Sequence, residues 1–183
     1  SAAHIEILSV INNRVSANSM EGRAALGHYN PVQDKHTLYT STQHPFGIRQ
    51  TLAMRAFNEP MAKFHVIAPD VGGGFGRKLN VYAEEALLGW LALKRSRPGK
   101  WIEERRENIQ ATIHGRGQIG EVEAAVKKDG TLLALRYKVV ADIGAYHQLF
   151  TPAIPPFTGL MLSGCYKIPA IGIELRAAFT NKM

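Results

Sequence analysis

A glycine-rich segment at residues 66–79 constrains the fold of this chain more than any other part of the sequence. Residues 64–68 are apolar and predict a short buried strand. Three consecutive glycines, residues 72–74, then let the backbone approach another group closely, because no side chains intervene. We expect Asn80 to be the N-cap of a helix that begins at Val81. Free backbone N–H groups and a helix N-terminus directed at one point predict an oxyanion or phosphate site.

The glycine segment matches neither of the two common phosphate-binding motifs. A P-loop ends in Gly-Lys followed by Ser or Thr, whereas Gly76 is followed here by Arg77, Lys78 and Leu79. The dinucleotide fingerprint requires a third glycine where Arg77 stands. Glycine clusters alone favour a structural tight turn, and only the flanking strand and helix bring the two interpretations to even weight.

A second strand-to-helix turn precedes the glycine segment. Residues 37–42 are β-prone, Pro45 suits the first position of a helix, and an apolar stripe continues to about Asn58. With the next strand and a helix to about Arg95, the order strand, helix, strand, helix predicts two parallel strands joined by a right-handed crossover. Both turns then open at the same edge of the sheet, so Gln43 in the first turn and the glycines of the second form the expected site.

The sequence beyond Trp101 changes character. Residues 121–126 and 132–141 alternate in polarity around a Lys-Asp-Gly turn, which predicts a β-hairpin. Residues 151–160 are rich in Pro, Gly and Thr and predict a loop. We therefore expect an α+β fold, with a small βαβα core of parallel strands in residues 1–115 and antiparallel hairpin additions in residues 116–183. The abrupt ends of the chain indicate a fragment of a longer protein.

Composition excludes several classes of protein. The chain has 183 residues, of which 45% are hydrophobic, and no apolar run is long enough to span a membrane. Its one cysteine, Cys165, fits a reducing, cytoplasmic compartment and is expected to be a buried structural thiol. The seven histidines are scattered, so we expect no metal held by the protein's own side chains.

The net charge of +7 raises the alternative of a nucleic-acid-binding domain. The densest basic stretch, residues 94–106, is interrupted by Glu103 and Glu104 and lacks interleaved aromatic residues. A solvated face, or a patch that meets an acidic partner, is the better interpretation.

Six segments, in this order, together resemble one known family. They are residues 20–23 (Met-Glu-Gly-Arg), 42–45 (Thr-Gln-His-Pro), 65–76 (His-Val-Ile-Ala-Pro-Asp-Val-Gly-Gly-Gly-Phe-Gly), 100–108 (Lys-Trp-Ile-Glu-Glu-Arg-Arg-Glu-Asn), 141–145 (Ala-Asp-Ile-Gly-Ala) and 180–182 (Thr-Asn-Lys). The pattern is similar to the molybdopterin-binding large subunits of the xanthine dehydrogenase and aldehyde oxidase family, closest to the large chain of aerobic carbon monoxide dehydrogenase. The resemblance covers the whole chain.

The resemblance implies an oxidoreductase that oxidises a small substrate (an aldehyde, a heteroaromatic compound or carbon monoxide) with water as the oxygen source. Molybdenum would be held by the pterin, in its cytosine dinucleotide form, and electrons would leave through FAD and 2Fe-2S clusters on partner subunits of an oligomer. Gln43 is implied to lie near an oxygen ligand of molybdenum. Gly73, Gly74, Phe75 and Gly76 are implied to lie against the cofactor, with Gln43 and Phe75 as the catalytic candidates.

Some expectations stay open at this stage. Gln43 could instead cap the helix that begins at Pro45, and Phe75 could pack into a core. Purine-oxidising relatives carry a glutamate where Leu79 stands and an arginine where Phe157 stands, so the resemblance argues against xanthine as the substrate. The family's general base lies beyond residue 183, so we expect the isolated fragment to be inactive. A non-catalytic cofactor-binding or subunit-assembly module is the alternative function.

Overall fold

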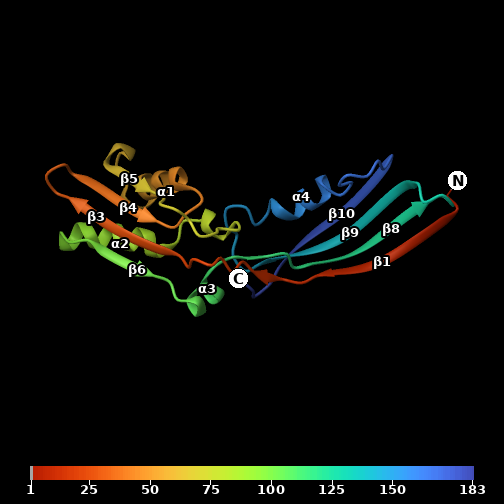
Figure 1. Cartoon of the computed structure of the whole chain (residues 1–183), viewed down its shortest axis with the longest axis horizontal. Coiled ribbons are helices and arrows are strands. Elements are labelled where there is room, and N and C mark those ends of the chain that lie inside the picture. The colour runs from red at the N-terminus through yellow and green to blue at the C-terminus, as the bar shows by residue number, and fades with distance from the viewer. Residues whose placement is uncertain (1) are drawn as a thin grey trace. The chain divides into compact units, whose positions relative to one another are not determined.

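The computed structural model of the chain describes residues 2–183 and divides into two units. The loop unit is Ser16–Ile113, and the hairpin unit joins the segment that ends at Val15 to His114–Met183. Strand β1 (His4–Asn12) pairs along its length with β8 (Gln118–Val126). β1 lies within residues 1–115, the range expected to form the core with the glycine segment, but this pairing places it in the sheet of the hairpin unit (Figure 1).

The sheet of the loop unit has the strand order β5-β4-β3-β6. Its strands are β3 (Ala24–Asn30), β4 (Lys35–Thr40), β5 (Phe64–Ile67) and β6 (Gly99–Ile102). β3 pairs antiparallel with β4 and with β6, whereas β4 and β5 are parallel. The predicted strand–helix–strand crossover is therefore confirmed.

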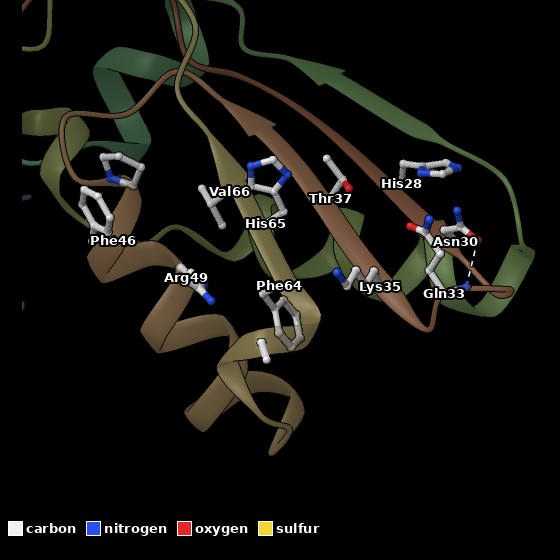
Figure 2. A pocket seen from close by; sticks show the side chains of 12 residues that line it. His28, Asn30, Gln33, Lys35, Thr37, Phe46, Arg49, Phe64, His65 and Val66 are labelled. Atoms are coloured by element: carbon white, nitrogen blue, oxygen red, sulfur yellow. Dashed lines mark hydrogen bonds between the residues drawn. The ribbon is translucent and has the colours of Figure 1, made fainter.

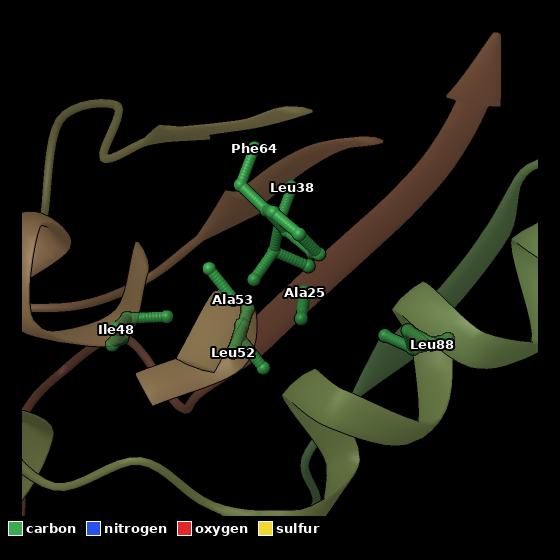
Figure 3. Packing of buried hydrophobic residues seen from close by; sticks show 7 residues of the cluster. All are labelled: Ala25, Leu38, Ile48, Leu52, Ala53, Phe64 and Leu88. Atoms are coloured by element: carbon green, nitrogen blue, oxygen red, sulfur yellow. The ribbon is translucent and has the colours of Figure 1, made fainter. Parts of the chain in front are cut away.

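Helices cover the sheet of the loop unit and enclose its core. α1 (Pro45–Thr51) continues as the π-helical segment η1 (Leu52–Phe57), and the one-turn helix η2 (Met61–Lys63) leads into β5. α2 (Ala83–Arg95) packs mainly on β3, and α3 (Arg105–Ala111) follows β6. The side chains that meet in this core, shown in Figure 3, are Ala25, Leu38, Ile48, Leu52, Ala53, Phe64 and Leu88.

The helix after the glycine segment begins later than the sequence predicts. A short 3₁₀ turn, η3 (Arg77–Leu79), comes first, and Asn80 is extended rather than an N-cap. α2 begins at Ala83 because the Glu85 carboxylate accepts the Tyr82 N–H at 3.1 Å and so caps the first turn. The glycine segment therefore lies one turn of irregular chain away from the helix N-terminus that we expected beside it.

The hairpin unit contains a sheet of strand order β1-β8-β9-β10. β8 pairs antiparallel with β9 (Leu132–Gly144), which confirms the predicted hairpin, and β10 (Ala170–Phe179) adds in parallel to β9. The predicted loop at residues 151–160 is wrong over most of its length, because α4 (Ile154–Leu160) forms there. Its prolines fall in the first turn, where a missing N–H costs nothing.

Two short strands, β2 (Val15–Ser16) and β7 (His114–Gly115), pair with each other outside both larger sheets. In the described part of the chain, no helix has the length and apolar character needed to cross a membrane.

Candidate functional site

The two strand-to-helix turns of the loop unit meet, as the parallel strands predict. The first turn follows β4 and carries Gln43, and the second follows β5 and carries the glycines. The Gly76 N–H donates to Gln43 Oε1 at 3.0 Å. The Gln43 N–H donates in turn to the Lys78 carbonyl at 2.9 Å. Gln43 and the glycine segment therefore form one site.

The side chain of Gln43 does not cap α1. The N-cap of α1 is His44, without a side-chain cap, and the His44 N–H donates to Thr42 Oγ1 at 3.0 Å. Because the Gly76 N–H must bond to an oxygen, it fixes which end of the Gln43 amide is the carbonyl. Within the part of the chain that the structure describes, this leaves the NH₂ group of the exposed Gln43 as a donor without a protein acceptor.

The glycine segment has a backbone that few other residues could adopt. Gly73 and Gly76 have φ values of 96° and 87°, in the left-handed region that glycine tolerates. Phe75 is also left-handed, with φ of 52°, although it carries a side chain. Such a conformation costs a non-glycine residue about 1–2 kcal/mol and is concentrated at functional sites. The ring is 74% exposed, so in this chain Phe75 does not pack into a core.

Among residues 72–76, two N–H groups have no partner within the described part of the chain. The N–H groups of Gly73, Arg77 and Leu79 donate to carbonyls of the segment itself, and that of Gly76 donates to Gln43. Those of Gly74 and Phe75 donate to no protein acceptor in residues 2–183. Two consecutive unpaired donors beside an exposed amide form a group suited to a negatively charged oxygen.

Gly74 is the position of closest approach between the two turns. A Cβ atom at Gly74 would lie 2.2 Å from Gln43 Oε1 and 2.3 Å from Gln43 Cδ. By contrast, a Cβ at Gly76 would meet nothing within 4 Å. Only Gly74 therefore requires the absence of a side chain in order to keep Gln43 in place.

Arg77 and Lys78, which follow the glycines, turn inward. Each is 1% exposed. The Arg77 guanidinium donates to Asn108 Oδ1 and to Ser19 Oγ, and burial lowers its pKa while the charge of Glu103 opposes the change. The Lys78 ammonium donates to Glu21 Oε2 at 2.8 Å and to Ser41 Oγ at 2.6 Å.

A second buried pair stands behind Arg77. Glu103 accepts the Arg23 guanidinium at 2.7 Å and the Arg23 N–H at 2.9 Å, and Asn108 Nδ2 donates to Glu103 Oε2 at 2.6 Å. The Arg23 guanidinium also lies 3.8 Å from the centre of the Tyr82 ring. Burial opposes ionisation of both groups, but their mutual bonds outweigh it, so the pKa of Arg23 is raised and that of Glu103 is lowered.

Sequence reasoning assigned no role to Ser19, Glu21 or Ser41, although they support the glycine segment. The motif at residues 20–23 carried part of the family resemblance, and that was the signal available for Glu21. Nothing in the spacing indicates that Glu21 meets Lys78, which lies far along the chain.

A separate groove of the loop unit lies on the open face of β3, β4 and β5. It has a volume of about 730 Å³ and is lined by polar side chains that include His28, Lys35, Arg49 and His65 (Figure 2). Neither Gln43 nor the glycines line it.

The sequence singled out three further residues. Leu79 ends η3 in the loop unit, and Phe157 lies in α4 of the hairpin unit. Cys165 is exposed in this chain, so the expected buried thiol is wrong, because the turn after α4 that carries it is left uncovered. The described residues contain no cluster of three or more His, Cys, Asp or Glu side chains that could hold a metal ion.

The chain matches a family of known proteins over its whole length. Residues 1–183 match the family model of the molybdopterin cofactor-binding domain. The chain is 34% identical to the nicotine 6-hydroxylase large subunit of Paenarthrobacter nicotinovorans, over 99% of this chain and 22% of that protein. It is 33% identical to the carbon monoxide dehydrogenase large chain of Hydrogenophaga pseudoflava, over 92% of this chain and 21% of that protein.

The fold is likewise that of a known structure. The crystal structure of quinoline 2-oxidoreductase from Pseudomonas putida 86 is similar with a TM-score of 0.90 and 37% identity, over 100% of this chain and 23% of that one. The chain spans about a fifth of the length of these relatives. The predicted resemblance is confirmed, and the chain belongs to the family of molybdopterin cofactor-binding domains.

Proposed function

We propose that the two turns of the loop unit form this chain's contact with the molybdopterin cofactor. The observation that carries the proposal is the hydrogen bond from the Gly76 N–H to Gln43 Oε1, because it leaves the NH₂ group of Gln43 as a donor. The unpaired N–H groups of Gly74 and Phe75 lie in the same segment. The site thus offers neutral donors and little side-chain bulk, which fits an anionic cofactor rich in oxygen and sulfur.

Each residue of the site has a distinct task in this proposal. The Gln43 NH₂ group and the N–H groups of Gly74 and Phe75 donate to negatively charged atoms of the bound cofactor. None of these donors titrates near neutral pH, so their contribution does not change when protons move during the reaction. Phe75 is 74% exposed, so its ring is available to contact the bound cofactor. When bound, the cofactor supplies two-electron oxidation.

For the intact protein, we propose a molybdenum-dependent oxidoreductase that oxidises a small substrate with water as the oxygen source. The names of the relatives support this class, since they are a nicotine hydroxylase, a carbon monoxide dehydrogenase and a quinoline oxidoreductase. Leu79 and Phe157 are apolar where purine-oxidising relatives carry charges, which favours an aldehyde, a heteroaromatic compound or carbon monoxide. FAD and iron–sulfur partner subunits, the cytosine dinucleotide form of the cofactor and a cytoplasmic location complete the proposal.

The test is Gln43→Ala in the intact protein. Loss of one preorganised donor should lower turnover about 100- to 1,000-fold. Molybdenum content should remain near normal, because Gly74 and Phe75 still donate. Gln50→Ala is the matched control, since Gln50 is an exposed glutamine on α1 outside the site. Turnover that equals that of the control would refute the role of Gln43.

The alternative is a cofactor-binding or assembly module without chemistry. It predicts tight binding to partner subunits without bound pterin, or bound pterin without turnover in the complete complex. Purification of the complex, followed by molybdenum analysis and an assay with a dye acceptor, separates the two functions.

A further inference from the structure

One carboxylate oxygen connects both turns of the proposed site. Glu21 Oε2 accepts hydrogen bonds from Ser41 Oγ at 2.7 Å, from the Gly72 N–H at 2.9 Å and from Lys78 Nζ at 2.8 Å. Ser41 lies two residues before Gln43, while Gly72 and Lys78 stand on either side of residues 73–77. The three donors therefore come from the first turn, the start of the glycine segment and its end.

Backbone bonds reinforce the same connection. The Glu21 N–H donates to the Gly72 carbonyl at 3.2 Å. Glu21 therefore bonds to both the N–H and the carbonyl group of Gly72. The Lys78 carbonyl accepts the Gln43 N–H at 2.9 Å and Thr42 Oγ1 at 3.0 Å. Lys78 thus bonds to Glu21 through its side chain and to the Gln43 turn through its backbone.

The bond between Lys78 and Glu21 depends on the charge of both groups. The Lys78 side chain is 0% exposed, and its ammonium reaches the one carboxylate of Glu21. A buried ammonium that loses its carboxylate is strongly disfavoured, so Lys78 would have to move or lose its proton if Glu21 were neutral. Either change would shift the end of the glycine segment.

We propose that Glu21 is a positioning residue for cofactor binding: its ionised carboxylate fixes the spacing between Gln43 and the glycine segment. This inference rests on the proposed function of the two turns. Glu21 acts through the groups that it holds, and its effect on the reaction is transmitted by Gln43.

The ionised state of Glu21 gives the proposal a pH dependence. Partial burial opposes ionisation, but the bonds from Lys78, Ser41 and Gly72 outweigh it and lower the pKa of Glu21. Other charged groups also lie nearby: Arg77 donates to the Glu21 carbonyl, and Arg105 donates to the Met20 carbonyl. The Glu103 carboxylate, which is paired with Arg23, would lie 3.9 Å from a Cβ atom placed on Gly22. The lowered pKa means that the carboxylate holds the turns at neutral pH and releases them as the pH falls through its folded-state value.

The experiment uses the intact holoenzyme and the variant Glu21→Gln. The rate of cofactor release, followed by molybdenum analysis after gel filtration, should rise roughly 10- to 100-fold at neutral pH, because bonds to a charged group are lost. Cofactor release from the wild type should become faster as the pH falls, whereas release from Glu21→Gln should not show this pH-dependent increase. Ser41→Ala, which keeps the charge but removes one donor, should show a smaller increase even if Glu21→Gln folds poorly.

Asp34→Asn is the matched control. Asp34 is a carboxylate of the same unit with bonds to Lys63 and Tyr29, and it lies at the turn between β3 and β4. Its left-handed backbone, with φ of 49°, also suits asparagine. Release from this variant should match that from the wild type.

A double-mutant comparison distinguishes positioning from general destabilisation. If Glu21 acts by placing Gln43, Glu21→Gln should reduce turnover in the wild type but have little further effect in Gln43→Ala. The proposal would be overturned if the losses of turnover in the two single variants multiplied in the double variant. It would also be overturned if cofactor release from Glu21→Gln equalled that from Asp34→Asn at every pH. If Gln43→Ala alone leaves turnover unchanged, the proposed function fails, and the release rates still decide whether Glu21 positions the segment.

Discussion

Gly74→Ala in the intact protein would displace a functional side chain at little cost in folding. The added Cβ would lie 2.2 Å from Gln43 Oε1, so the Gln43 side chain must rotate away. The backbone accepts alanine, because Gly74 is not among the left-handed glycines. The obstacle is therefore a movable, exposed side chain and not the main chain.

The effects on stability and on turnover should differ in size. Rotation of Gln43 breaks its bond to the Gly76 N–H, worth about 0.5–1.5 kcal/mol in net stability. Replacing glycine by alanine in a compatible conformation returns about 0.4–1 kcal/mol through the unfolded state. The two contributions nearly cancel, so Tm should change little. Turnover should nevertheless fall about 100- to 1,000-fold, as for Gln43→Ala, because the same donor is lost.

Gly76→Ala provides the opposite case. Gly76 has φ of 87°, and a Cβ there would meet nothing within 4 Å. We expect strain of about 1–2 kcal/mol without displacement of Gln43. Thermal unfolding and steady-state kinetics of both variants should therefore rank them in opposite orders. Gly74→Val, with a larger side chain, should also lose cofactor. If Gly74→Ala keeps molybdenum and most of its turnover, the close approach is structural and the site lies elsewhere.

Further predictions concern the chain and its relatives. The isolated 183-residue chain should show no turnover with an aldehyde, a purine or carbon monoxide and a dye acceptor, and reproducible turnover would contradict the proposal that the chain acts only within a larger enzyme. In the intact enzyme, xanthine should have a lower kcat/KM than benzaldehyde or carbon monoxide, and the reverse order would refute the argument from Leu79 and Phe157. Burial opposes ionisation of Asp142, but bonds from Thr180 and Lys182 outweigh it and lower the pKa to about 2. Its stabilising contribution, about 2 kcal/mol, should be complete above about pH 5 and lost toward pH 2, measured as the difference in unfolding free energy from Asp142→Asn.

The meeting of the two turns could be predicted from sequence, because it follows from topology. A strand, a helix and a second strand make parallel neighbours, and their carboxyl ends share one edge. Gln43 and the glycines each follow such a strand, so their proximity required no knowledge of side-chain packing. The hairpin of β8 and β9 followed in the same way from alternation around a turn.

Element boundaries were less predictable where local signals competed. Asn80 is a good N-cap residue, but Glu85 caps a helix that starts later, at Ala83. A further short-range bond supports this later start, because Tyr82 Oη donates to the Arg77 carbonyl at 2.7 Å. At residues 151–160, composition favoured a loop, whereas Gly159 lies against Ile173 of β10 and allows α4 to pack there. In α4, a contact between segments distant in sequence therefore outweighed the local preference.

Arg77 and Lys78, which follow the glycines, show what the difference from a phosphate-binding motif means for the site. Arg77 and Lys78 stand where a phosphate-binding motif would place its lysine and its hydroxyl, and both are buried. Both side chains bond to groups behind the segment, Lys78 to Glu21 and Arg77 to Ser19 and Asn108, so they brace the segment instead of facing a ligand. What remains at the surface is neutral: an amide and backbone N–H groups. Such neutral donors stabilise a negative charge that changes during a reaction, and they place no full positive charge beside it. This property suits redox chemistry better than it suits retention of a phosphate.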